Sequence, residues 1–163
     1  MVGGGKGLIM RTEIGEAYEG SAAPALQAAK GQRLSLRRAI DEFQAALDAP
    51  SGAGDVERLV SVLDHVRVVF GVHVEVTESP GGLYDEILEL APRLANKIAR
   101  FRREHAAISA AIPTSLDDLR NEAMPLATLQ GSLSQLLETL VRHSKRGADL
   151  VHEAYHVDIG GES

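Results

Sequence analysis

The sequence predicts an all-α fold, an antiparallel up-down bundle of four long helices. Four segments of the chain repeat their apolar residues at spacings of three and four, which is the period of a helix that buries one face. Clusters rich in proline and glycine separate these segments, and no segment alternates apolar and polar residues over a useful length, as a half-buried strand would. Helices with short connections pack as antiparallel neighbours.

The first two helices are bounded by residues that favour helix ends. The first is expected to begin near Pro24, because proline suits the first turn of a helix, and to end before the breaker cluster 49–52. The second is expected to begin at Asp55, a residue type that caps helix N-termini, and to run to about Glu78. Residues 1–22, which are rich in glycine at their start, are expected to form a flexible N-terminal arm.

Two more long helices are predicted in the second half of the chain. A short helical turn over 83–90 leads to the third helix, which has Pro92 in its first turn and ends before Pro113. The segment 114–125 is expected to be a loop with a short helix. The fourth helix is expected over 126–157, where a long apolar stripe precedes a glycine pair.

Length and composition indicate one domain with an ordinary core. The chain has 163 residues, 44% of them hydrophobic and 25% charged, so a bundle over 23–158 with a C-terminal tail over 159–163 is of normal size. The formal net charge of −6 argues against nucleic acid or an anionic membrane as a partner. No stretch approaches the roughly 20 apolar residues of a membrane span, and the N-terminal residues do not predict a secretory leader, so a cytoplasmic protein is expected. The chain contains no cysteine, which excludes disulfides and thiolate chemistry.

Three histidines, each on the apolar stripe of a different predicted helix, are the main functional signal. His73, His105 and His143 take positions where the helical repeat predicts a leucine. A buried imidazole needs a partner for each ring nitrogen. Because the apolar stripes of a bundle face one interior, we expect the three rings to meet there within about 8 Å of each other. Together they could hold a metal ion.

The segments that carry these histidines resemble the hemerythrin-like family, the four-helix HHE cation-binding domain. The resemblance covers about residues 24–158 and rests on 63–78 with Gly82-Leu83-Tyr84, on Arg103-Glu104-His105 with Ile108, and on His143 with Ala148-Asp149-Leu150 and Glu153-Ala154-Tyr155. It implies a non-haem iron site with imidazoles and bridging carboxylates. It also implies a sensor or carrier of oxygen or nitric oxide, or an iron-handling protein, more than an enzyme.

The chain departs from the family's pattern at three positions. Arg33 stands where the family has an inward histidine on the first helix, and Thr77 and Gly147 stand where it has carboxylates one turn after a histidine. Two iron ions need roughly ten ligand atoms, with carboxylates to offset their charge. The residues present can instead hold one divalent ion, with positions open for water or a diatomic ligand.

The remaining carboxylates and Arg33 leave two interpretations open. Glu78 is the first candidate for a carboxylate ligand, and Glu104 and Asp149 are further candidates. Arg33 is expected inside the bundle or at its mouth, in an ion pair with Glu78 or Glu104, where its charge would disfavour a metal. The chain is then either a bundle that binds one or two iron ions or another divalent ion, or a metal-free bundle that acts as a protein-interaction module.

A second pattern, His152-Glu153-Ala154-Tyr155-His156, matches the H-E-x-x-H motif of zinc peptidases. In those enzymes two imidazoles on one helix face bind zinc and the glutamate acts as general base. Only residues 157–163 follow this motif, so a third ligand downstream is not expected. We expect an exposed helix end, because histidines near a helix C-terminus interact favourably with the helix dipole.

Overall fold

The computed structural model describes residues 9–122 and 124–156, with side chains from residue 24 onward. Its elements in chain order are α1 (Ile9–Asp48), α2 (Asp55–Glu78), α3 (Leu83–Leu90), the 3-10 turn η1 (Pro92–Leu94), α4 (Ala95–Asn121) and α5 (Leu126–His156). The described residues contain no strand, so the prediction of an all-α fold is confirmed. None of the helices in these ranges is long and apolar enough to cross a membrane.

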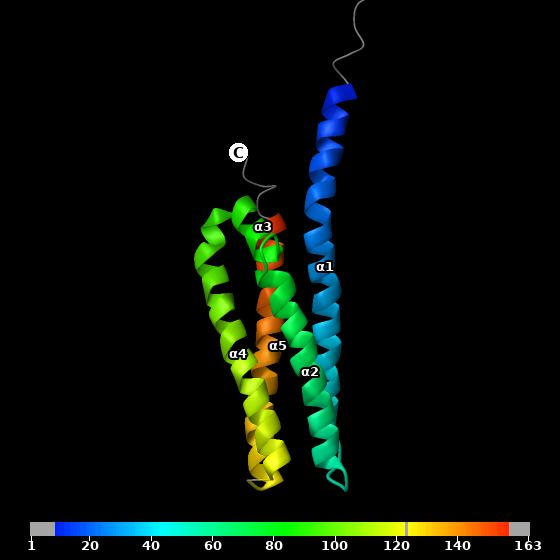
Figure 1. Cartoon of the computed structure of the whole chain (residues 1–163), viewed down its shortest axis with the longest axis vertical. Helices are drawn as coiled ribbons and strands as arrows, with labels where there is room; N and C mark the ends of the chain where they lie inside the picture. The colour runs from blue at the N-terminus through cyan, green and yellow to red at the C-terminus, as the bar shows by residue number, and fades with distance from the viewer. Residues whose placement is uncertain (1–8, 123, 157–163) are drawn as a thin grey trace, which may run out of the picture.

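The four long helices lie side by side along the long axis of the molecule (Figure 1). Helix α1 packs mainly against α2 and α5, and α4 packs mainly against the same two helices. The short helix α3 lies near one end of the bundle, where it contacts α1, α2 and α5. The α1–α2 and α4–α5 connections lie at the opposite end (Figure 1). The four helices therefore surround one interior.

Two clusters of buried apolar side chains fill this interior. The larger cluster takes residues from all four long helices, and the smaller one lies toward α3. On α4, for example, Phe101 belongs to the smaller cluster and Ile108 to the larger one. Burying a leucine, isoleucine or phenylalanine contributes roughly 1.5–3 kcal/mol. The helices are therefore held together by apolar packing on both sides of the region where the histidines lie.

The turn before α2 explains why that helix begins at its predicted residue. Gly54 has φ of 85°, a left-handed conformation that glycine adopts without strain. The Asp55 carboxylate accepts one hydrogen bond from the backbone N–H of Gly52 and one from the guanidinium of Arg58, each at 2.8 Å. The predicted bounds of α2, from Asp55 to Glu78, are confirmed.

Two helices extend past prolines that were predicted to bound them. Helix α1 begins at Ile9, upstream of Pro24, and α4 continues through Pro113 to Asn121. Inside a helix, proline removes one backbone hydrogen bond and its ring clashes with the preceding turn, so other interactions must offset that cost. In α4 the buried stripe continues beyond the proline to Leu116 and one turn further. The predicted loop with a short helix over 114–125 was wrong for residues 114–121, because the buried stripe continues α4 to Asn121.

The predicted chain ends fall only partly within the described residues. Of the arm expected over 1–22, residues 9–22 are helical and extend α1 beyond the end of the bundle (Figure 1). Residues 1–8 lie outside the described part of the chain, and so does the tail expected over 159–163. The last long helix, expected over 126–157, is α5 and ends at His156.

Candidate metal centre

Three buried histidines from three helices meet in the interior. His73 comes from α2, His105 from α4 and His143 from α5. The Nε2 atom of His143 lies 3.1 Å from that of His105 and 3.4 Å from that of His73. The ring centroids are 4.8–5.6 Å apart, which confirms the prediction that the rings lie close together. The three residues form a group that could hold a metal ion.

The histidines lie at the boundary between the two apolar clusters. On α5, Leu140 precedes His143 in the larger cluster and Leu150 follows it in the smaller one. Phe101 and Ile108 flank His105 on α4 in the same way. One polar layer therefore crosses an apolar interior, and its groups must find their partners among themselves or in a bound ligand.

Carboxylates hold the outer nitrogens of two of the three rings. His105 Nδ1 lies 2.6 Å from Glu78 Oε1, and His143 Nδ1 lies 3.0 Å from Glu104 Oε2. An ionised carboxylate can only accept a hydrogen bond, so Nδ1 of each ring carries the proton and donates it. In this tautomer the Nε2 atom of each ring has a lone pair, and both lone pairs are directed to the centre of the site.

Two polar groups lie near these Nε2 atoms: the Tyr84 hydroxyl is 3.4 Å from Nε2 of His105, and Nε2 of His73 is 3.4 Å from that of His143. Two acceptor nitrogens 3.1 Å apart repel each other unless a proton or a metal ion lies between them. Burial, and next the neighbouring imidazoles, lower the pKa of His73 and of His105 to about 3. Burial also lowers the pKa of His143. A proton shared between the rings is therefore disfavoured at neutral pH, whereas a metal ion, which the three rings could hold, would bind both lone pairs.

The spacing of the Nε2 atoms fits one transition-metal ion. Nitrogen ligands lie about 2.0–2.1 Å from zinc, so two of them in a tetrahedral site are about 3.3 Å apart. The separations from Nε2 of His143 to the other two Nε2 atoms, 3.1 and 3.4 Å, lie on either side of this value. An outer carboxylate on a ligating imidazole fixes its orientation and raises its basicity. The three ligand atoms all lie within 4.8 Å of one another, so the group could hold one metal ion.

Glu78 and Glu104, the predicted carboxylate ligands, contact the outer nitrogens of two histidines and do not face the centre of the site. Each lies outside the ring of Nε2 atoms, on the Nδ1 side of a histidine from another helix, and is about a quarter exposed, at 26% and 23%. Asp149, the further candidate, is exposed. The prediction placed Glu78 beside His73, its neighbour on α2. The structure pairs it with His105 on α4, because the two helices pack side by side.

Arg33 lies at the mouth of the site without the predicted ion pair. Glu78 and Glu104 contact histidines of α4 and α5 instead, and no acidic side chain in the described part of the chain pairs with Arg33. Burial lowers the pKa of the guanidinium, and its charge contributes to lowering the pKa of His73. The predicted location is therefore confirmed and the predicted partner is wrong.

A small cavity opens beside the histidines on the α1 and α5 side. Its volume is about 20 Å³, and its wall includes Arg33, His73, Thr77, Tyr84, His143 and Gly147. A cavity of this size holds one molecule about as large as water. A Cβ added at Gly147 would meet no atom within 4 Å, so this glycine lies next to open space. The site therefore has room for one small ligand beside the rings.

Aromatic rings enclose the histidines. The Phe70 ring centroid lies 5.7 Å from those of His73 and His105 and 5.8 Å from that of His143. Tyr84 stacks on His105 at 5.7 Å with an interplanar angle of 13°, and its hydroxyl lies 3.4 Å from Nε2 of that histidine. Tyr84 and Phe70 are both buried, at 3% and 1% exposure. The resemblance signalled Tyr84, whereas nothing in the sequence distinguished Phe70 from other core residues.

The H-E-x-x-H segment lies at the exposed end of α5, as predicted. His152 and His156 are exposed, with ring centroids 4.5 Å apart. The Glu153 carboxylate forms an ion pair with Lys97 of α4. Among the described residues no third ligand joins the two histidines in a metal-binding group. The geometry therefore gives no support to a peptidase site.

The three histidines remain the best-supported functional group of the chain. Comparisons with known protein families, with curated proteins and with solved structures find no match. The likeness to hemerythrin-like bundles thus rests on the sequence motifs around His73, His105 and His143, and it stays a prediction. The geometry of the site is the observation that bears on function.

Proposed function

We propose that this chain is a metal-binding protein of the hemerythrin-like type. In this proposal an antiparallel up-down bundle holds one divalent iron or zinc ion through the Nε2 atoms of His73, His105 and His143. The observation that carries it is the pair of Nε2 atoms 3.1 Å apart, while carboxylates hold the protons on the outer nitrogens. A cation at the centre converts this repulsion into two ligand bonds.

The ligand set favours one ion over two. In the described residues the metal-binding group consists of three imidazoles, and no carboxylate oxygen belongs to it. Paired iron sites in helical bundles use several carboxylates to offset the charge. Imidazole nitrogen suits iron, zinc, copper and nickel, and three protein ligands leave a coordination position open. The iron that the family resemblance implies therefore fits as a single ion.

The cavity suggests what the open position binds. About 20 Å³ accommodates a water molecule or a diatomic such as dioxygen or nitric oxide. A polymeric substrate does not fit, and Glu153, the general base of the H-E-x-x-H pattern, is paired with Lys97 on the surface. Carriage or sensing of a small molecule at the metal ion is therefore favoured over hydrolysis.

Titration with Fe²⁺ and Zn²⁺ under anaerobic conditions tests the proposal. We expect the parent protein to bind one equivalent, and His143→Ala to abolish binding without loss of helix content, because the fold rests on apolar packing. His152→Ala is the matched control, since His152 is on the same helix, exposed and outside the buried group. Its affinity should equal that of the parent.

The other outcomes of this titration are equally informative. If the parent protein binds no metal, the metal-free interaction module becomes the better account of the buried histidines. If His152→Ala loses binding while His143→Ala retains it, the site lies at the end of α5 and the proposal is wrong.

A further inference from the structure

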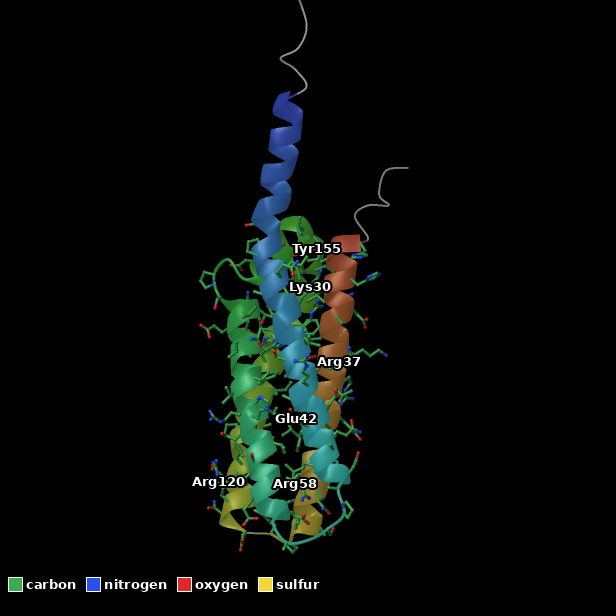
Figure 2. The ribbon with its side chains drawn as sticks, turned by 90° about the vertical axis from the view of Figure 1, so that its right-hand side faces the viewer. Lys30, Arg37, Glu42, Arg58, Arg120 and Tyr155 are labelled. Atoms are coloured by element: carbon green, nitrogen blue, oxygen red, sulfur yellow. The ribbon has the colours of Figure 1, made fainter. Side chains whose placement is uncertain are left out.

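A cationic groove lies on the surface of the bundle, between α1 and α5. Its volume is about 720 Å³, and the cations on its wall are Lys30, Arg33, Arg37 and Lys145. Two carboxylates, those of Asp41 and Asp149, also line it, so positive charge is in excess. Figure 2 looks onto this face and labels Lys30 and Arg37 on α1. The whole chain has a net charge of −6, so the groove is a local reversal of sign that favours an acidic partner.

The groove also exposes apolar side chains. Leu34 of α1 and Val141 of α5 line it, and they are 52% and 46% exposed. Among the described residues, no carboxylate forms an ion pair with Lys30, Arg37 or Lys145. Apolar side chains bordered by such cations suit an amphipathic helix that carries acidic residues.

The N-terminal part of α1 has the composition of such a helix. Residues 9–22 extend α1 beyond the end of the bundle, and in both views no other described element lies beside them (Figures 1 and 2). The sequence of this segment contains three glutamates, at positions 13, 16 and 19, and one arginine. Met10, Ile14 and Tyr18 recur at every fourth position, which is the spacing of an apolar helix face.

A second copy of the chain can bring this segment to the groove. The segment cannot reach the groove of its own chain, because α1 is one continuous helix and residues 9–22 lead away from residues 30–44. At roughly 1.5 Å per residue, the segment and the α1 wall of the groove are each about 20 Å long. Segment and groove therefore match in length as well as in charge.

The helical period also brings the acidic and the basic residues of α1 onto one face. Glu19 and Arg37 are about five turns apart, so they share a face of the helix. In an antiparallel pair of helices related by a two-fold axis, the same face of each helix meets the other. With the axis near Leu26 and Gln27, Glu16 of one copy lies opposite Arg37 of the other.

We propose that two copies of this chain form an antiparallel dimer in which residues 9–22 of each copy lie in the α1–α5 groove of the other. The glutamates of the segment pair with the cations of the groove, and the apolar face of the segment covers Leu34 and Val141. Because the pair is symmetric, each contact occurs twice. The dimer does not depend on the metal ion of the proposed function.

Sedimentation equilibrium of the full chain at low ionic strength tests the dimer. We expect a mass of twice the 17.4 kDa of one chain. Arg37→Glu should raise the dissociation constant of the dimer about tenfold or more, because it replaces attraction by repulsion at both contacts. Arg38→Glu is the matched control, since Arg38 is exposed on α1 and does not line the groove. It should dimerise as the parent does.

A charge swap tests the pairing of the segment with the groove. Glu16→Arg alone should weaken the dimer as Arg37→Glu does. The double variant Glu16→Arg/Arg37→Glu should recover most of the affinity, because opposite charges meet again. The proposal is overturned if the parent is monomeric at a concentration on the order of 0.1 mM, if Arg37→Glu dimerises as tightly as the parent, or if the double variant is as weak as the single ones.

Discussion

The Nδ1 atom of His105 lies 2.6 Å from Oε1 of Glu78, so a carboxylate of α2 holds an imidazole of α4. Glu104 of α4 holds His143 of α5 in the same way, at 3.0 Å. Each contact joins two neighbouring helices and fixes a ring with Nε2 toward the centre. His73 is the exception, because its buried Nδ1 has no hydrogen-bond partner.

The first prediction concerns these outer carboxylates. Glu78→Gln and Glu104→Gln should each weaken metal binding about 10–100-fold, the usual effect of losing an outer partner of a ligating histidine. Competition with a chelator of known affinity measures the change. Glu75→Gln is the control, because Glu75 is on α2 and exposed. If both carboxylate variants bind as tightly as this control, the carboxylates do not support the ligands.

The second prediction ranks the three histidines. His73→Ala should weaken metal binding less than His105→Ala or His143→Ala, because the ring without an outer acceptor is the least basic and the least fixed ligand. Dissociation constants for Zn²⁺ measured on the three variants check the order. Circular dichroism of each variant shows whether the fold is intact. The largest loss at His73 would contradict the ranking.

The third prediction is a loss of stability of the metal-free protein in acid. The pKa values of His73 and His105 are about 3 in the folded protein and about 6.5 when unfolded. Below about pH 6.5 the unfolded chain therefore binds more protons, and the free energy of unfolding falls as the pH decreases toward 3. The slope should be on the order of 1 kcal/mol per pH unit for each histidine.

Urea unfolding at a series of pH values between 7 and 4 measures this slope. His105→Leu should show a shallower decline, because it removes one of the three buried histidines whose pKa is lowered in the folded protein. His65→Gln, which changes an exposed histidine paired with Glu42, should leave the decline as it is in the parent. A free energy of unfolding that stays constant over this range would contradict the prediction.

The fourth prediction concerns Gly147, which lies inside α5 beside the cavity. Gly147→Ala should stabilise the protein by about 0.5–1 kcal/mol, because alanine loses less backbone entropy in a helix and its Cβ meets no atom within 4 Å. Thermal unfolding measures the gain. Gly131→Ala, also within α5 and also next to open space, should give a similar gain. A lower melting temperature for Gly147→Ala would show a close approach at this position.

Much of the fold could be predicted from the sequence alone. The helix bounds that were predicted wrongly lie at two prolines. The apolar repeat predicted where α2 and α5 lie and which face of each is buried, so it placed the histidines in the interior. Such a period is local, and it can be counted along the chain. At Pro113 the sequence predicted the end of a helix, whereas the buried stripe of α4 continues to Leu119 and the helix continues through the proline. At Pro24 the sequence predicted the first turn of a helix, whereas α1 begins at Ile9.

The tertiary structure decided which residues complete the site. Glu78 and His105 are 27 residues apart, and Glu104 and His143 are 39 apart. Counting along one helix gives the direction in which a side chain points, but it does not give the rotation of the neighbouring helix. Glu78 was therefore predicted beside His73 on its own helix, and Arg33 was predicted to pair with Glu78 or Glu104. The packing of α2, α4 and α5 against one another sets those rotations. Because of that packing, Glu78 and Glu104 contact the Nδ1 atoms of His105 and His143. No acidic side chain in the described residues pairs with Arg33 at the mouth of the cavity.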